Sequence, residues 1–464
     1  MARNIFVFAA IMCSYVCLPC VAASATSGGD REAAARDFID CLAKGDFAGA
    51  EGVFDAATKR ALPADALAQT WKSVQAAVGS YERQEAVRTA RIGGNDCVYV
   101  TCRFERGLLD AKMVFNSAGE VVAFGFVAPQ AAVSQSTEPL PAYLAGDGVR
   151  ETQVSVGDGK SALPGTLTKP KGAPPYAAVV LVHGSGPNDR DETVGLNKPF
   201  RDLARGLAAN GVAVLRYDKR TLVFGSEMRA TAGTLTVKQE AVDDALAAVK
   251  LLRADKEIDP GKIFVLGHSL GGYLAPKIGK LDSRIAGLII LAGNSRPLED
   301  LILGQTRYIC SLNGPVRQDM RAQMAAVEAQ VARVKNPTFA ATRYSPGELP
   351  LGIPQAYWAD LKSYDPVLTA AGLGRPILIL WGERDYQVTR ADFDGWRKGL
   401  SASPNATFKS YPALNHLFME GQGRSTPAEY QRAGHVPEQV ILDICRWIKE
   451  SRPESGHAAT EGAR

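Results

Sequence analysis

From residue 177 onward, runs of consecutive apolar residues alternate with longer amphipathic segments, and this alternation restricts the possible folds more than any other feature. The apolar runs are 177–182, 212–217, 262–266, 285–291 and 376–381, and amphipathic segments include 198–210 and 237–253. Continuous apolar strands are typical of a parallel sheet covered by helices on both faces. The alternation therefore predicts a doubly covered α/β domain, with segments 152–156 and 165–169 forming an antiparallel hairpin ahead of it.

The alternation is interrupted between Arg296 and Asp365, where the sequence is helical in pattern and punctuated by proline. Segments 316–335 and 354–358 carry the helical pattern. An insertion after a strand of a parallel sheet lies over the carboxyl ends of the strands, where ligands bind in such sheets. We expect this segment to form a helical cap over a site.

The region before residue 129 has a different pattern of apolar and polar residues. Helical patterns are followed by alternating, strand-like segments with turn signals between them; the helical patterns cover 32–44, 47–60 and 65–78, and the strands 81–91, 97–105, 109–115 and 121–127. Helices followed by a meander predict a small α+β domain. Segment 128–144, rich in Pro, Ser, Ala and Gln, is predicted as linker. The expected boundaries are 26–128, linker 129–150, α/β domain 151–452 and a disordered tail 453–464.

The first 25 residues have the pattern of a secretory signal peptide. Arg3 precedes an apolar stretch over 5–22, and Ala23-Ser24-Ala25 fits a small-residue cleavage site. We therefore expect export, to the periplasm or the medium, without stable membrane insertion after cleavage. The alternative is an uncleaved N-terminal anchor, because the apolar stretch approaches the roughly 18 residues that can span a bilayer.

The charge balance limits the kinds of partner that the chain is expected to bind. The chain has 53 Lys and Arg against 49 Asp and Glu, and removing the leader takes away only Arg3, so the formal charge falls from +4 to +3. This balance indicates neither a nucleic-acid nor an anionic-membrane partner.

Five cysteines remain after the leader is removed: Cys41, Cys97, Cys102, Cys310 and Cys445. Cys97 and Cys102 lie roughly 16 Å apart along one strand, too far for a disulfide. Cys41 pairs with one of them, or all five stay unpaired.

The pentapeptide Gly267-His268-Ser269-Leu270-Gly271 follows the apolar run 262–266 and opens into a helical segment. A strand, a sharp turn and a helix are the setting of a nucleophile elbow, in which serine occupies the apex of a strained turn. Side chains two residues before and after the serine would clash, and Gly267 and Gly271 remove that clash. Ser269 is therefore the candidate nucleophile.

A serine nucleophile needs a base and an acid that orients the base, and in this arrangement the acid and then the histidine follow the serine along the chain. Of the five histidines, His183 and His268 precede Ser269, His457 lies in the tail and His435 near the last helix. His416, just after the strand-like segment 407–411, is the predicted base. Asp385, following segment 376–381, is the predicted acid, with Glu383 as its competitor.

Acyl transfer also needs donors for the oxyanion. The backbone N–H of Leu270 is one candidate, and the N–H of Ser185, in the glycine-rich loop His183–Asp191, is the other. This loop lacks the Lys-Ser/Thr of a phosphate-binding loop and the G-x-G-x-x-G of a dinucleotide site. We interpret the charges at 189–191 and 218–220 as ion pairs that shape the loops. No metal and no cofactor is expected.

These motifs, with segments 216–220, 382–388 and 414–418, resemble bacterial serine esterases of the α/β-hydrolase superfamily that carry a small N-terminal, cone-like, nuclear-transport-factor-like domain. The resemblance spans residues 38–448. It implies an α/β-hydrolase fold with a helical cap, a Ser269–His416–Asp385 triad and hydrolysis of small carboxylic esters through an acyl-enzyme. The N-terminal domain shows no acid–base cluster, so self-association or substrate gating is expected of it. The alternatives are a serine peptidase or amidase with the same triad, and a non-catalytic binding protein on a hydrolase scaffold.

Overall fold

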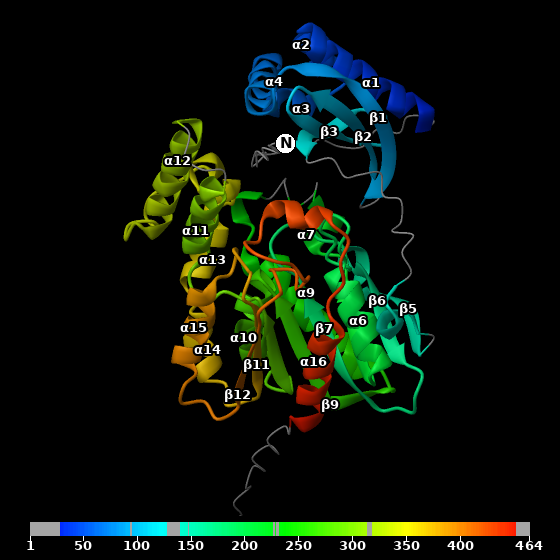
Figure 1. Ribbon diagram of the computed structural model, residues 1–464, viewed down its shortest axis with the longest axis vertical. Coiled ribbons are helices and arrows are strands. Elements are labelled where there is room, and N and C mark those ends of the chain that lie inside the picture. The colour runs from blue at the N-terminus through cyan, green and yellow to red at the C-terminus, as the bar shows by residue number, and fades with distance from the viewer. Residues whose placement is uncertain are drawn as a thin grey trace, which may run out of the picture. The chain divides into compact units, whose positions relative to one another are not determined.

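The computed structural model describes residues 28–92, 95–127, 140–146, 148–225, 228, 232–312 and 318–451 (Figure 1). The predicted signal peptide and the predicted C-terminal tail lie outside these residues. The chain forms two compact units. Of the described residues, unit 1 contains 28–92, 95–127, 222–225, 228, 232–234 and 345–354, and unit 2 contains the others.

Unit 1 contains helices followed by an antiparallel sheet, as the sequence predicts. Its helices are α1 (Gly28–Lys44), α2 (Phe47–Gly52), α3 (Ala56–Ala61) and α4 (Ala64–Val78), with the short helical turns η2 (Ala232–Thr234), η4 (Pro346–Glu348) and η5 (Pro350–Gly352). Its strands are β1 (Tyr81–Ile92), β2 (Asn95–Phe104), β3 (Gly107–Phe115) and β4 (Val121–Val127), hydrogen-bonded in that order. One face of the sheet packs on the helices through alternate buried residues such as Val98, Val100 and Cys102. This alternation is what a half-covered antiparallel sheet requires.

The single helix predicted over 47–60 is wrong, because the chain breaks between α2 and α3. The backbone of residues 53–55 pairs with the start of β4: Val121 N–H donates to the Val53 carbonyl at 2.9 Å, and Asp55 N–H donates to the Val121 carbonyl at 3.1 Å. The Asp55 carboxylate then accepts the Thr58 N–H at 2.7 Å and caps α3. Bonding to the sheet and a new N-cap together outweigh continued helix.

The cysteine pairings considered from the sequence do not form in unit 1. Cys41 is a thiol, which excludes its pairing with either Cys97 or Cys102. Cys102 lies in the core, and burial raises the pKa of its thiol to about 12. Cys102 therefore packs as a small apolar side chain.

Unit 2 is built on a mostly parallel sheet. Its strands are β5 (Val149–Val156), β6 (Leu163–Pro170), β7 (Tyr176–Val182), β8 (Val212–Tyr217), β9 (Ile258–His268), β10 (Gly287–Leu291), β11 (Ile377–Gly382) and β12 (Ala406–Tyr411). Their order across the sheet is β12-β11-β10-β9-β7-β8-β6-β5. The predicted hairpin is confirmed, since β5 and β6 pair antiparallel and join the edge through β8. The strands from β7 to β12 are parallel to one another, so their carboxyl ends share one edge.

Helices cover both faces of this sheet, which confirms the predicted α/β class (Figure 1). The helical elements of unit 2 are α5 (Ala142–Ala145), η1 (Gly159–Ser161), α6 (Pro199–Ala209), the π-helical turn η3 (Lys238–Val242), α9 (Asp243–Ala254), α10 (Leu270–Leu281), α11 (Leu298–Ser311), α12 (Gln318–Lys335), α13 (Gln355–Lys362), α14 (Pro366–Ala371), α15 (Arg390–Gly399), η6 (Pro427–Gln431) and α16 (Glu438–Glu450), and α7 (Arg220–Val223) crosses the unit boundary. α6 and α16 pack on the face that carries Val179 and Leu181. α9 and α10 cover the other face, where Leu288 lies against α10.

The end of the predicted linker belongs to unit 2 instead. Residues 128–139 lie outside the described part of the chain, but α5 packs on the α6 side of the sheet. Leu144 is buried there, and the Tyr143 hydroxyl donates to the Val436 carbonyl at 2.8 Å. The packing of Tyr143 and Leu144 against the core explains why this stretch is helical although the sequence around it is rich in small and polar residues.

The predicted cap segment forms helices α11, α12 and α13 in unit 2, whereas its residues 345–354, with η4 and η5, belong to unit 1. α11 follows the carboxyl end of β10 and is tied to α12 by the ion pairs Lys335–Asp300 at 2.5 Å and Arg307–Glu328 at 2.8 Å. Among the described residues, no helix combines the length and the apolar character that crossing a bilayer requires.

Candidate active site

Ser269 lies on a strained turn between β9 and α10. Its φ is 52° and its ψ is −116°, a left-handed conformation that costs a non-glycine residue of order 1–3 kcal/mol. The Ser269 N–H donates to the Leu291 carbonyl of β10 at 2.9 Å, and its carbonyl accepts from Tyr273 N–H at 3.0 Å. The turn therefore lies at the carboxyl edge of the sheet, with the serine half-buried.

Glycines make this turn possible because backbone lies where side chains would otherwise be. A Cβ on Gly267 would lie 2.0 Å from the Gly271 carbonyl oxygen, and a Cβ on Gly271 would lie 2.1 Å from the Val182 carbonyl oxygen. A Cβ on Gly272 would lie 2.8 Å from the Cα of Gly293. Strand β7, the turn and the segment after β10 are thus packed backbone to backbone around Ser269.

His416 and Asp385 form a buried pair at the same edge of the sheet. Asp385 follows β11 and His416 follows β12, and His416 Nδ1 lies 2.7 Å from Asp385 Oδ2. The other carboxylate oxygen, Oδ1, accepts the N–H groups of Gln387 and Val388 at 2.7 and 2.9 Å. The carboxylate is therefore fixed, and it fixes the ring so that Nε2 is the nitrogen left for proton exchange.

The Asp385 competitor, Glu383, points elsewhere. Its carboxylate accepts the Ser410 hydroxyl at 2.7 Å on the exposed side of β12. The structure thus brings His416 together with Asp385 and not with Glu383.

The loop that carries His416 is shaped by the side chain of Asn415. Its Oδ1 accepts the N–H groups of Leu417 and Met419 at 3.0 and 3.2 Å. Phe418 takes a φ of 60° within this turn. Asn415 was not among the residues predicted from the sequence, although asparagine is a common turn former that hydrogen-bonds the backbone two residues on.

The glycine-rich loop after β7 approaches the serine turn closely. A Cβ on Gly184 would lie 3.1 Å from the Cβ of Ser269. Gly184 N–H donates to Glu192 Oε1 at 2.6 Å and is not available to a substrate. Within the described residues, the N–H groups of Ser185 and Leu270 have no acceptor. These are the two donors expected from the sequence.

Comparison with known proteins follows the same division of the chain. Residues 179–433 match the alpha/beta hydrolase family, and residues 35–124 match a protein family of unknown function, DUF3887. The chain belongs to the alpha/beta hydrolase family. Esterase EstD from Thermotoga maritima is 36% identical over 411 residues, which are 89% of this hydrolase and 93% of EstD.

Two solved structures that match this hydrolase are more distant from it in sequence. An esterase from Pyrococcus furiosus is 15% identical with a TM-score of 0.39, covering 65% of this chain and 90% of that one. An acylaminoacyl peptidase from Pyrococcus horikoshii is 14% identical with a TM-score of 0.44, covering 81% of this chain and 57% of that one.

Ion pairs shape the loops of the hydrolase around Gly184. Arg190 binds Asp218 through two nitrogens at 2.7 and 3.0 Å, and Asp191 contacts Arg216 at 3.0 Å. Lys219, which is buried, donates to the Gly184 carbonyl at 2.8 Å and pairs with Glu240 at 3.0 Å. The sequence predicted ion pairing here, but no residue pattern separated Lys219 from its charged neighbours.

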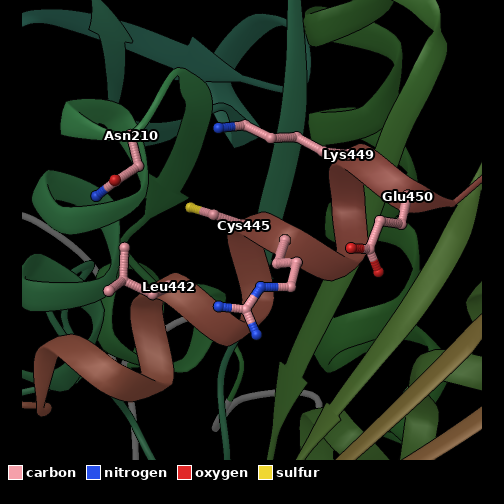
Figure 2. Close-up of a pocket in the computed structure, with 6 residues that line it drawn as sticks. Asn210, Leu442, Cys445, Lys449 and Glu450 are labelled. Atoms are coloured by element: carbon pink, nitrogen blue, oxygen red, sulfur yellow. The ribbon is translucent and has the colours of Figure 1, made fainter.

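Elsewhere, the hydrolase has a cavity of about 320 Å³ beside α16, lined by Asn210, Leu442, Cys445, Arg446, Lys449 and Glu450 (Figure 2). Asn210 follows α6 and precedes β8, so this cavity lies at the amino edge of the sheet, away from Ser269. Burial raises the pKa of Cys445 to about 12, so its thiol is protonated at neutral pH and a weak nucleophile.

No cluster of His, Cys, Asp and Glu that could bind a metal occurs within the residues described.

Replacing Gly271 by alanine should destabilise the hydrolase by about 3 kcal/mol, because its new Cβ meets the carbonyl of Val182. The matched control is Gly304→Ala within α11, where the new Cβ meets nothing within 4 Å and helix propensity favours alanine. Chemical denaturation of both variants measures the difference. Equal stability of the two variants would contradict the backbone packing described for the turn.

His183 should make the hydrolase less stable in mild acid. Burial lowers its pKa from 6.5 to about 4, and its Nε2 lies 3.0 Å from the Asp189 carbonyl oxygen. Between these two values the unfolded chain binds the proton and the folded chain does not, so stability falls as pH decreases from 6.5 to 4. The full shift is worth about 3 kcal/mol. His183→Gln keeps a donor for Asp189 but cannot titrate, so its unfolding free energy should depend less on pH in this window. An unchanged pH slope would assign the titration to other groups.

Proposed function

We propose that the protein is an exported carboxylic ester hydrolase in which Ser269 is the nucleophile, His416 the general base and Asp385 the acid that orients it. The observation that carries this proposal is the buried His416–Asp385 pair at the strand ends beside the strained Ser269 turn. The name and the extent of the relative EstD support ester cleavage as the reaction.

In the first half of the reaction, Ser269 Oγ attacks the ester carbonyl while His416 Nε2 takes the hydroxyl proton. The C–O bond to the alcohol then breaks, and His416 returns the proton to the leaving alcohol. In the second half, water attacks the acyl-serine, again with His416 as base, and the acid product leaves. Asp385 stays ionised and stabilises the imidazolium that forms twice in each cycle.

The oxyanion would be held by the N–H groups of Leu270 and Ser185. Leu270 is the first residue of α10, so its N–H also carries the positive end of that helix. Gly184 positions the Ser185 peptide because both of its own backbone polar groups are bound, to Glu192 and Lys219. Each such donor contributes about 10²–10³ in rate.

Hydrolysis of nitrophenyl esters of graded acyl length tests this mechanism. Ser269→Ala should lower kcat by at least about 10³, because nucleophilic catalysis is lost while binding groups stay in place. Ser401→Ala, an exposed serine near the end of α15, is the matched control and should keep full activity. Aminoacyl amides measured in parallel identify a peptidase instead. Full ester hydrolysis by Ser269→Ala would refute the triad.

The export part of the proposal depends on Arg3, the apolar stretch 5–22 and the Ala23-Ser24-Ala25 site. Expression in a bacterium with separate periplasmic and cytoplasmic fractions should give a periplasmic protein that begins at Thr26. A chain that keeps residues 1–25 and sediments with membranes would instead indicate an uncleaved anchor.

A further inference from the structure

Glu192 is a buried carboxylate that the mechanism above does not use. It lies within the segment between β7 and α6, is 3% exposed and has a φ of 51°. A left-handed φ is uncommon for glutamate and persists only where surrounding contacts determine it. Both carboxylate oxygens of Glu192 make such contacts, and the two contacts reach different loops.

The first contact holds the loop that carries Ser185. Glu192 Oε1 accepts the Gly184 N–H at 2.6 Å, and Gly184 is the residue whose Cβ would lie against Ser269. From the other side, Lys219 Nζ donates to the Gly184 carbonyl at 2.8 Å. The Gly184 carbonyl and the Ser185 N–H belong to one peptide group, so Lys219, together with Asn188 Nδ2 at 3.2 Å, fixes the direction of the Ser185 N–H. Glu192 fixes the peptide group before it, so that Gly184 is held on both sides.

The second contact reaches the loop of the general base. Glu192 Oε2 lies 2.9 Å from His268 Nδ1, in a buried contact of charges rather than a well-directed hydrogen bond. His268 Nε2 lies 2.9 Å from the backbone carbonyl oxygen of His416, and the two rings are 4.8 Å apart. Donation from His268 Nε2 to that carbonyl links Glu192 to the backbone that carries the base.

The charges of the pair are consistent with this arrangement. Burial lowers the pKa of His268, but the Glu192 carboxylate outweighs it and raises that pKa above the ordinary value. Burial likewise raises the pKa of Glu192, and the His268 imidazolium outweighs it and lowers that pKa. The neighbouring His183 is neutral, because burial lowers its pKa to about 4. Both shifts favour the ionised forms of Glu192 and His268, in agreement with their 2.9 Å contact.

We propose that Glu192 is a positioning residue that links two segments beside Ser269. Through Gly184 it holds the segment that carries the Ser185 N–H, and through His268 it holds the segment that carries His416. The inference rests on the proposed serine mechanism. Glu192 does not touch the reacting atoms, so its loss should act on kcat, through misdirected transition-state contacts, and leave KM nearly unchanged.

Three variants of Glu192 distinguish its positioning role from the effect of its charge and from an effect on folding. Glu192→Gln keeps an acceptor for Gly184 and presents an amide donor to a neutral His268, so we expect kcat within about 3-fold of wild type. Glu192→Leu keeps the volume without either contact, and we expect kcat to fall about 10- to 100-fold with KM within about 3-fold. Glu192→Asp keeps the charge, tolerates the left-handed φ and is one methylene too short to reach both partners. It should also lose kcat, and it decides the question if the leucine variant does not fold.

The matched control is Asp202→Leu in α6. Asp202 is also a fully buried carboxylate paired with a histidine, His435 Nδ1 at 3.0 Å, but it contacts neither site loop. It should lose stability and keep kcat. Hydrogen exchange gives a second readout: Glu192→Leu and Glu192→Asp should speed exchange in segments 183–192 and 413–420 together, and Asp202→Leu should not.

Loss of kcat in the leucine and aspartate variants with rescue by glutamine supports the inference. Wild-type kcat in both Glu192→Leu and Glu192→Asp, or an equal loss in Asp202→Leu, overturns it while the Ser269 result stands. Ester hydrolysis that does not depend on Ser269 overturns the proposed function itself, and then only the joint change in hydrogen exchange remains as support for the link between the loops.

Discussion

The backbone turn at Ser269 is the constraint on which the rest of unit 2 depends. Its φ is 52°. Because Gly267 and Gly271 have no Cβ atoms, the carbonyl groups of Gly271 and Val182 can occupy those positions and pack closely around the turn. Such contacts are possible only when β7, β9 and β10 are neighbours in the sheet, as they are. The strand order, the glycine positions and the exposure of the serine are therefore one structural solution, in which sheet packing sustains local strain.

A second feature is the density of buried charge around the backbone of one residue, Gly184. Glu192 binds the N–H of Gly184 and Lys219 binds its carbonyl, and each charge has its own partner, in His268 and Glu240. Buried charges are costly unless paired, and removing one partner leaves the other uncompensated. Such pairs do not by themselves argue for stability. They argue for a defined geometry, and the second of the two peptide groups that they hold contains the candidate oxyanion donor, the N–H of Ser185.

Much of this could be predicted from the sequence, because the signals were local. Continuous apolar runs predicted β7 to β11, and the chain order of serine, acid and histidine led to Asp385 and His416, which the structure brings together. The errors have tertiary causes. The break between α2 and α3 depends on bonding to Val121, more than 60 residues away, and α5 depends on Val436. Glu192 looked like any other acid of a charged loop, because only the fold places it against Gly184 and His268.

If Ser269 forms an acyl-enzyme, a covalent trap should capture the acyl or phosphonyl group on this residue. The protein is mixed with a nitrophenyl ester or an organophosphonate, quenched in acid, digested and analysed by mass spectrometry. We expect one added group, on the peptide that contains Gly267 to Gly272, and none in Ser269→Ala. A modified residue elsewhere, or no modification of a preparation that hydrolyses the ester, would contradict it.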